Sequence, residues 1–148
     1  MKIVRQGLVV AIAIYLAAYV VGCAHFHDIK FLDRACIEPY VGYEYQTCRP
    51  MRVLIDDATY IVPQNFETDL ASIPRILWPI LAPQYTDFVA PAILHDYLYR
   101  CNNHISRKLA DEILYSALIA ENVTSYTAYK FYLAVRLFGG SHFTDGDC

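Results

Sequence analysis

The hydrophobic period of the chain changes from two residues to about four near its middle, and this change restricts the fold more than any other feature. Arg52–Ile55 and Thr59–Val62 are rich in β-branched residues and flank a polar pair at 56–57, which predicts a β-hairpin. Residues 107–121 instead carry apolar side chains at helical spacing. Strands followed by helices are typical of α+β proteins. We therefore expect an α+β fold, with a small antiparallel sheet or hairpin followed by a three-helix unit.

Three segments in the second half of the chain are predicted to be helices, each preceded by a side chain that can accept a hydrogen bond from a helix amide. Gly139-Gly140 ends the last segment, as glycine commonly does. The tyrosines of the third helix, Tyr126, Tyr129 and Tyr132, are expected in the core or on a membrane-facing surface. The expected helices span about 88–100, 107–121 and 125–138, and their expected caps are Asp87, Ser106 and Thr124.

Length and composition limit the class of protein. The 148 residues suit a single domain, and a composition of 56% apolar and only 18% charged residues excludes intrinsic disorder. The net charge of -3 argues against a nucleic-acid-binding protein, whose surface would be basic. The sequence contains neither a glycine-rich dinucleotide motif nor a phosphate-binding loop, so we expect no nucleotide site of either kind.

The N-terminus has the features of an export signal. Lys2 and Arg5 precede an apolar run over residues 7–22, which is shorter than the roughly 20 residues of a membrane-spanning helix. The run ends in Val20-Val21-Gly22-Cys23, which resembles a bacterial lipobox, in which the cysteine is lipidated and becomes the new N-terminus. An uncleaved anchor helix with an incidental cysteine is the alternative.

Lipidation at Cys23 would divide the chain into three parts. Residues 1–22 would be a lipoprotein signal peptide, residues 23–40 an irregular tether that includes Pro39, and residues 41–148 a single α+β domain with a first strand at Val41–Cys48. The domain would then lie in the cell envelope on the periplasmic side, attached to a membrane through its lipid.

The number of cysteines fits an oxidising compartment. Lipidation of Cys23 would leave four of the five, an even number that is typical of disulfide-bonded proteins. The sequence has no Cys-x-x-Cys pair, which argues against a zinc ribbon. Of the three possible connectivities, we favour the one that closes a short local loop and attaches the C-terminal tail to the helices. The favoured pairs are Cys36–Cys48 and Cys101–Cys148.

The dipeptide His95-Asp96, inside the first predicted helix, is the main candidate for chemistry. Consecutive helical residues point about 100° apart, so His95 and Asp96 face different neighbours. Antiparallel packing of the next helix would bring Asp111 toward His95. A carboxylate on one imidazole nitrogen sets the tautomer and leaves the other nitrogen as a base. Asp96 would then hold a cation such as calcium, which prefers oxygen ligands.

The pattern His95-Asp96-x-x-Tyr99, followed by Arg107 and Asp111 in the next helix, resembles the secreted phospholipase A2 superfamily. The resemblance implies that His95 activates a water molecule that attacks an ester, that Asp111 orients His95, and that Asp96 binds calcium. It also implies phospholipid acyl esters as the substrate class.

The calcium loop of that superfamily is rich in glycine and lies upstream of the histidine. This chain has no glycine between Tyr43 and Phe138. Asp69, in the segment 63–75 that we expect to be a loop, is therefore the expected substitute as a second calcium ligand. Calcium is the one cofactor that the sequence suggests.

A second resemblance covers more of the chain, from about Pro63 to Gly140. Three strings carry it in order, namely Thr-Asp-x-Ala-Ser-Ile-Pro at 68–74, His-Asp-Tyr-Leu-Tyr at 95–99 and Ser-Arg-x-x-Ala-Asp at 106–111. They resemble a family of short phage and bacterial proteins known as domain-of-unknown-function family 1353. That family implies no established activity, and it suggests a phage or prophage gene. The lipoprotein signal is a departure from the many members that consist of the domain alone.

Each polar residue of these motifs also has a structural explanation. His95 can be a buried histidine with one hydrogen bond, and Asp96 can pair with Arg100 four residues later. Asp111 near a helix start interacts favourably with the helix dipole. Ser72 paired with His95 as a nucleophile lacks the Gly-x-Ser-x-Gly elbow, and Ser72 can instead bond to its own turn.

The sequence leaves three functions open. The first is a membrane-tethered, calcium-assisted hydrolase of phospholipid esters with His95 as its base. The second is a non-catalytic phage lipoprotein that contacts a host envelope protein, for example to exclude later phages. The third is a structural component of the virion, against which the export signal argues.

Overall fold

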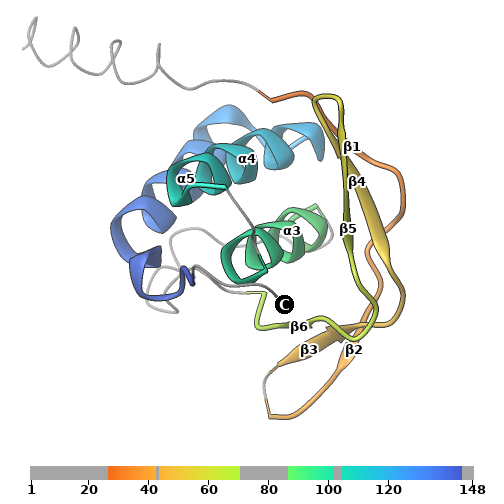
Figure 1. Cartoon of the computed structure of the whole chain (residues 1–148). Coiled ribbons are helices and arrows are strands. Elements are labelled where there is room, and N and C mark those ends of the chain that lie inside the picture. The colour runs from red at the N-terminus through yellow and green to blue at the C-terminus, as the bar shows by residue number, and fades with distance from the viewer. Residues whose placement is uncertain (1–26, 43, 71–86, 102–104, 145–148) are drawn as a thin grey trace, which may run out of the picture.

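Figure 1 shows a computed structural model of the chain, which describes residues 27–42, 44–70, 87–101 and 105–144. Three helices lie on one side of the molecule and a three-stranded sheet lies on the other, with a smaller sheet beside one end of it (Figure 1). This arrangement confirms the predicted α+β fold. The predictions that fall outside the described residues are those for the signal peptide, Cys23, Ser72 and Cys148.

The larger sheet consists of β1 (Ile29–Phe31), β4 (Met51–Ile55) and β5 (Ala58–Val62), which are antiparallel and lie in the order β1-β4-β5. Alternate residues of β4 are buried, as expected for a strand with one face against the helices. The predicted hairpin between β4 and β5 is confirmed. Asp56 in its turn has a φ of 51°, a left-handed conformation that aspartate tolerates.

The smaller sheet consists of β2 (Ile37–Pro39), β3 (Tyr45–Thr47) and β6 (Glu67–Thr68), in the order β2-β3-β6. Thr47 connects this sheet to the segment after β5. Its hydroxyl donates a hydrogen bond to the carbonyl of Pro63 at 2.7 Å and accepts one from the amide of Phe66 at 2.9 Å. These bonds hold the chain where it enters β6.

Three sequence-based expectations are wrong in this region. The segment 23–40 is not an irregular tether throughout, because it contains β1 and β2, which pair with β4 and β3. The segment 63–75 contains β6, and only Tyr45–Thr47 of the expected strand at 41–48 is a strand. Strands of two or three residues are too short to show a period, and their stability comes from pairing with distant residues.

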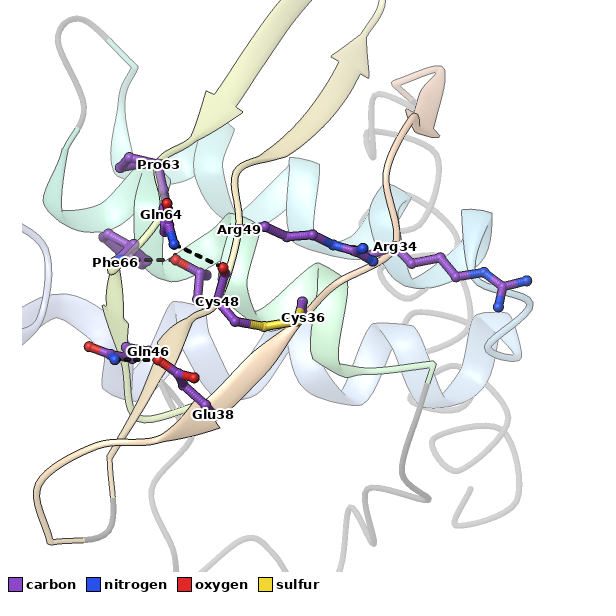
Figure 2. Close-up of a disulfide and its surroundings, with 10 residues drawn as sticks. Arg34, Cys36, Glu38, Gln46, Cys48, Arg49, Pro63, Gln64 and Phe66 are labelled. Carbon is purple, nitrogen blue, oxygen red and sulfur yellow. Dashed lines mark hydrogen bonds between the residues drawn. A yellow bond between two sulfur atoms is a disulfide. The ribbon is translucent and has the colours of Figure 1, made fainter.

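The predicted disulfide between Cys36 and Cys48 is present, with a Cα–Cα distance of 5.4 Å (Figure 2). It joins the segment that enters β2 to the segment that leaves β3. The carbonyl of Cys48 also accepts a hydrogen bond from Gln64 Nε2 at 3.1 Å. Cys101 is disulfide-bonded as well. Cys148 lies outside the described residues, so the pair Cys101–Cys148 stays a prediction.

The second half of the chain forms the three predicted helices and a final 3-10 turn. Every observed helix end lies within one residue of its predicted position. The side chains of Ser106 and Thr124 cap the second and third helices as predicted. The predicted cap of the first helix is wrong, because Phe88 and not Asp87 is at the N-cap position, and Phe88 makes no capping bond with its side chain. The elements are α3 (Val89–Arg100), α4 (Arg107–Ala120), α5 (Ser125–Phe138) and η2 (Gly139–Ser141).

Two apolar clusters hold these layers together. The larger one joins Val53 and Val62 of the first sheet to Ile93 and Leu98 of α3 and Ile113 of α4. The smaller one lies between α4 and α5. No helix in the described part of the chain is long and apolar enough to cross a bilayer. The smaller cluster consists of Leu114, Leu118, Ala128, Phe131, Ala134 and Val135.

Removing the disulfide with Cys36→Ser and Cys48→Ser is expected to lower the free energy of unfolding by about 3 kcal/mol, because the bond closes a loop between residues 12 apart. Urea unfolding followed by circular dichroism measures the change. Gln46→Ala is the matched control in the same sheet, since it removes only an exposed hydrogen bond to Glu38. A double variant as stable as this control would contradict the prediction.

Candidate functional site

The first candidate site lies between α3 and α4, where the predicted contact of His95 with Asp111 is formed. His95 Nε2 lies 3.0 Å from Asp111 Oδ1. The cap at Ser106 determines where α4 begins and so which of its residues face α3. Asp111 falls on the buried face of α4, beside Ala110 and Leu114.

Asp111 is 0% exposed and receives hydrogen bonds from two other helices. The hydroxyl of Tyr99 on α3 donates to Oδ1 at 2.5 Å, and Arg136 Nη1 on α5 donates to Oδ2 at 2.8 Å. Arg107 Nε lies 3.8 Å from the same Oδ2. His95, Tyr99, Arg107, Asp111 and Arg136 are called the Asp111 cluster below.

The pKa of Asp111 reflects two opposing effects. Burial raises the pKa, because a carboxylate in the core loses its hydration, but hydrogen bonds from His95, Tyr99 and Arg136 lower it to below the usual 3.8. The carboxylate is therefore ionised at neutral pH. Since an ionised carboxylate only accepts hydrogen bonds, Nε2 of His95 carries the ring proton at this contact. Burial, followed by the hydrogen bond to Asp111, raises the pKa of Tyr99, which stays protonated.

Two glycines after α5 allow the close approach of the cluster. A Cβ atom on Gly139 would lie 2.8 Å from the Tyr99 hydroxyl, and one on Gly140 would lie 2.5 Å from Arg107 Nη1. Arg107 also donates from Nη2 to the carbonyl of Arg136. The C-terminal end of α5 therefore packs directly on the cluster, and a side chain at 139 would collide with the buried ring of Tyr99, whereas one at 140 would need only the end of the Arg107 side chain to move.

The imidazole of His95 lies in the core. It is 1% exposed and packs on the ring of Tyr99, with the ring centroids 4.1 Å apart. The hydrogen bond of Nε2 to Asp111 holds the ring in one orientation, as a carboxylate does for a histidine that acts as a general base. It also connects three helices through buried polar contacts, which is a structural role that needs no substrate.

Asp96, the next residue on α3, lines a polar pocket of about 120 Å³. Asp96 is 4% exposed, and its Oδ2 accepts a hydrogen bond from Thr68 Oγ1 on β6 at 2.5 Å. Thr68 Oγ1 accepts in turn from the amide of Leu70 at 3.1 Å. The smaller sheet, α3 and the segment after η2 meet at this pocket. Its lining residues are Glu44, Glu67, Thr68, Asp69, Asp96, Tyr99, Arg100 and His142.

The two predicted calcium ligands, Asp96 and Asp69, line this same pocket. Glu44 and Glu67 add two further carboxylates to its wall. Among the residues that the structure describes, however, no three His, Cys, Asp or Glu side chains are grouped closely enough to hold a metal ion. Calcium takes about six to eight oxygen ligands, so the described residues alone do not form a calcium site.

Sequence reasoning finds four members of the Asp111 cluster and misses the fifth, Arg136. A signal for it is present, because a buried carboxylate needs a cation and Arg136 occupies the last turn of α5. Thr68 is also missed as the partner of Asp96, although it belongs to the same string as Asp69. A hydroxyl at the end of a two-residue strand carries no periodic signal, and only the fold brings it to α3.

The fold and these contacts define a small α+β protein in which the Asp111 cluster adjoins an acidic pocket. The family described as "Protein of unknown function (DUF1353)" matches residues 46–135, which is more than half of the chain. The chain belongs to this family, as the three sequence strings predicted. No curated protein and no solved structure matches the chain. The likeness to phospholipase A2 and the lipoprotein signal stay predictions.

Acidification is expected to weaken the helical unit through Asp111. Because the folded pKa of Asp111 lies below the unfolded value of 3.8, the ionised group stabilises the fold above pH 3.8. That contribution is lost as the pH falls below 3.8 and through the folded pKa. Asp111→Asn is expected to remove this dependence and to cost about 3–5 kcal/mol at neutral pH, since Arg136 then lacks its carboxylate. Urea unfolding at a series of pH values measures both effects.

Asp33→Asn is the control for this experiment. Hydrogen bonds from Arg52 lower the pKa of Asp33 to about 2, but that pair is exposed to solvent. Because an exposed pair contributes little to stability, the control should leave both the stability at neutral pH and the acid response near those of the wild type. If Asp111→Asn is as stable as Asp33→Asn at neutral pH, the cluster does not hold the helices together.

Proposed function

We propose that this protein is a membrane-tethered hydrolase of acyl esters, in which His95 is the general base and Asp111 positions it. The contact of His95 Nε2 with Asp111 Oδ1 at 3.0 Å is the observation that carries the proposal. Tyr99 bonds to the same carboxylate and holds it in place. The neighbouring residue Asp96 lines a pocket with polar walls, which Tyr99 of the cluster also lines, and this pocket offers a place for the substrate.

The reaction follows from the protonation state of His95. With Nε2 protonated at Asp111, Nδ1 accepts a proton from a water molecule. The water oxygen forms a bond to the ester carbonyl carbon, and the bond from that carbon to the alcohol oxygen breaks. The departing alcohol takes the proton from Nδ1, which returns the imidazole to its neutral state. Access of substrate to Nδ1 requires the groups that cover the ring of His95 to move.

Calcium is part of the proposal only as a ligand to be tested. A bound calcium ion would supply positive charge for the oxyanion that forms during attack. Asp96 and Asp69 would be its ligands from this chain. Because the described residues do not complete a calcium site, no step above depends on the ion.

The proposed location is the periplasmic side of a bacterial membrane, with Cys23 lipidated. The charged start, the apolar run over residues 7–22 and the lipobox-like string support this location. The disulfide of Cys36 with Cys48 supports an oxidising compartment. The phage or prophage origin is part of the proposal and is suggested by the sequence resemblance described above.

Release of fatty acid from phosphatidylglycerol vesicles by the full chain tests the hydrolase. His95→Gln keeps most of the side-chain volume and removes the base, so turnover is expected to fall by about 10²- to 10⁴-fold. His27→Gln is the matched control, because His27 bonds to Asp56 and lies outside the Asp111 cluster. Assays with calcium and with a chelator test the metal requirement.

A thermal melt of each variant is the companion measurement. Tyr99→Phe, which removes one bond to Asp111, should shift the pH profile of turnover if the carboxylate positions His95. Equal turnover by the wild type and a folded His95→Gln variant would overturn the proposal.

A non-catalytic envelope lipoprotein is the second candidate, and the 1% exposure of His95 is the observation that favours it. In that case the Asp111 cluster only stabilises the fold, and the protein acts by contact with a host envelope protein. Exclusion of a second phage from cells that express the chain is the readout. A folded His95→Gln variant should keep full exclusion, whereas Cys23→Ser should lose it. Loss of exclusion in both variants would argue against this candidate.

A further inference from the structure

The outer face of α5 carries a row of exposed apolar side chains. Tyr126, Leu133 and Leu137 are spaced seven and four residues apart, which places them on one line along the helix. Their exposed fractions are 75%, 38% and 72%. The opposite face of α5, with Ala128 and Phe131, packs into the cluster shared with α4. Tyr126, Leu133 and Leu137 are called the α5 stripe below.

The charges next to the α5 stripe are basic. Lys130 lies between Tyr126 and Leu133, and its Nζ is 4.8 Å from the centroid of the Tyr126 ring. α5 contains no acidic residue, and of its two basic residues Arg136 is bonded to Asp111, so Lys130 is the cation beside the stripe. An apolar stripe with a tyrosine and a neighbouring lysine suits a helix that lies on an anionic lipid surface.

The path of the chain brings α4, the neighbour of α5, close to the proposed lipid anchor at Cys23. His27 is the first described residue, and its amide donates a hydrogen bond to Ser116 Oγ on α4 at 3.1 Å. α4 is the neighbour of α5 in Figure 1. His27 follows Cys23 by four positions, and four extended residues span at most about 14 Å. A lipid at Cys23 would therefore hold the end of the domain where α4 meets the β4–β5 turn within that distance of the bilayer.

We propose that the α5 stripe docks on the anionic phospholipid surface to which the chain is tethered. Docking would bury the apolar side chains and hold the domain in one orientation, with Lys130 near the lipid headgroups. The proposal rests on the tether of the proposed function but not on the chemistry of His95. Membrane contact at α5 also agrees with one of the two expectations for the tyrosines of this helix.

Tryptophan quenching in vesicles tests the proposal. The full chain with Trp78→Phe, its only tryptophan removed, is placed in vesicles of phosphatidylglycerol and brominated phosphatidylcholine. Leu137→Trp and Tyr126→Trp report on the two ends of the α5 stripe. Ile61→Trp is the matched control, because Ile61 is 53% exposed on β5, across the helical layer from α5. Bromine is expected to reduce emission by about half at 137 and 126, since stripe residues enter the headgroup boundary, and to leave emission at 61 unchanged.

Four results would overturn the proposal. Unquenched emission at 137 and 126 in a chain that floats with vesicles would mean that the tether exists and the docking does not. A chain that does not float would remove the tether as well. Unquenched emission combined with concentration-dependent crosslinking through α5 would mean that a second copy covers the stripe. Equal quenching at 61 would show that the domain enters the lipid without a preferred face.

Discussion

The buried charge of Asp111 is the interaction on which the helical half of the molecule depends. A carboxylate without exposure is stable only when donors replace its lost water, and here the donors to this α4 residue come from α3 and α5. Each helix must keep its position for the donors to reach the two oxygens. Polar geometry therefore fixes the relative placement of three helices that apolar packing alone would allow to slide.

The consecutive residues His95 and Asp96 connect two regions of the protein. His95 faces the Asp111 cluster, whereas Asp96 bonds to Thr68 and lines the acidic pocket at the edge of the smaller sheet. Since α3 contributes to both, a shift of α3 caused by a ligand in the pocket would reach the imidazole directly. Tyr99 belongs to the Asp111 cluster and also lines the pocket, and this connection supports the hydrolase hypothesis. The burial of the His95 imidazole supports the alternative, a non-catalytic lipoprotein.

Local patterns allowed the helices and the β4–β5 hairpin to be predicted, because capping residues and periodic apolar positions act over a few residues. The contact of His95 with Asp111 was also predictable, since it needs only two neighbouring helices. The strands β1 and β6 were not, because their pairing partners lie far away in the sequence, and β2 was not, because three residues are too few to show a period. Arg136 was missed for a similar reason, as it reaches Asp111 from 25 residues further along the chain.

Gly139 shows how the Asp111 cluster restricts the substitutions that the sequence can accept during evolution. Its hydrogen atom occupies the space beside the Tyr99 hydroxyl where a methyl group would collide. A descendant that gains a side chain at 139 can restore the fit most simply by losing the phenol at 99. Positions 99 and 139 are therefore expected to evolve as a pair, although they are 40 residues apart. Correlated substitutions at these two positions among relatives would reveal the contact from sequence alone.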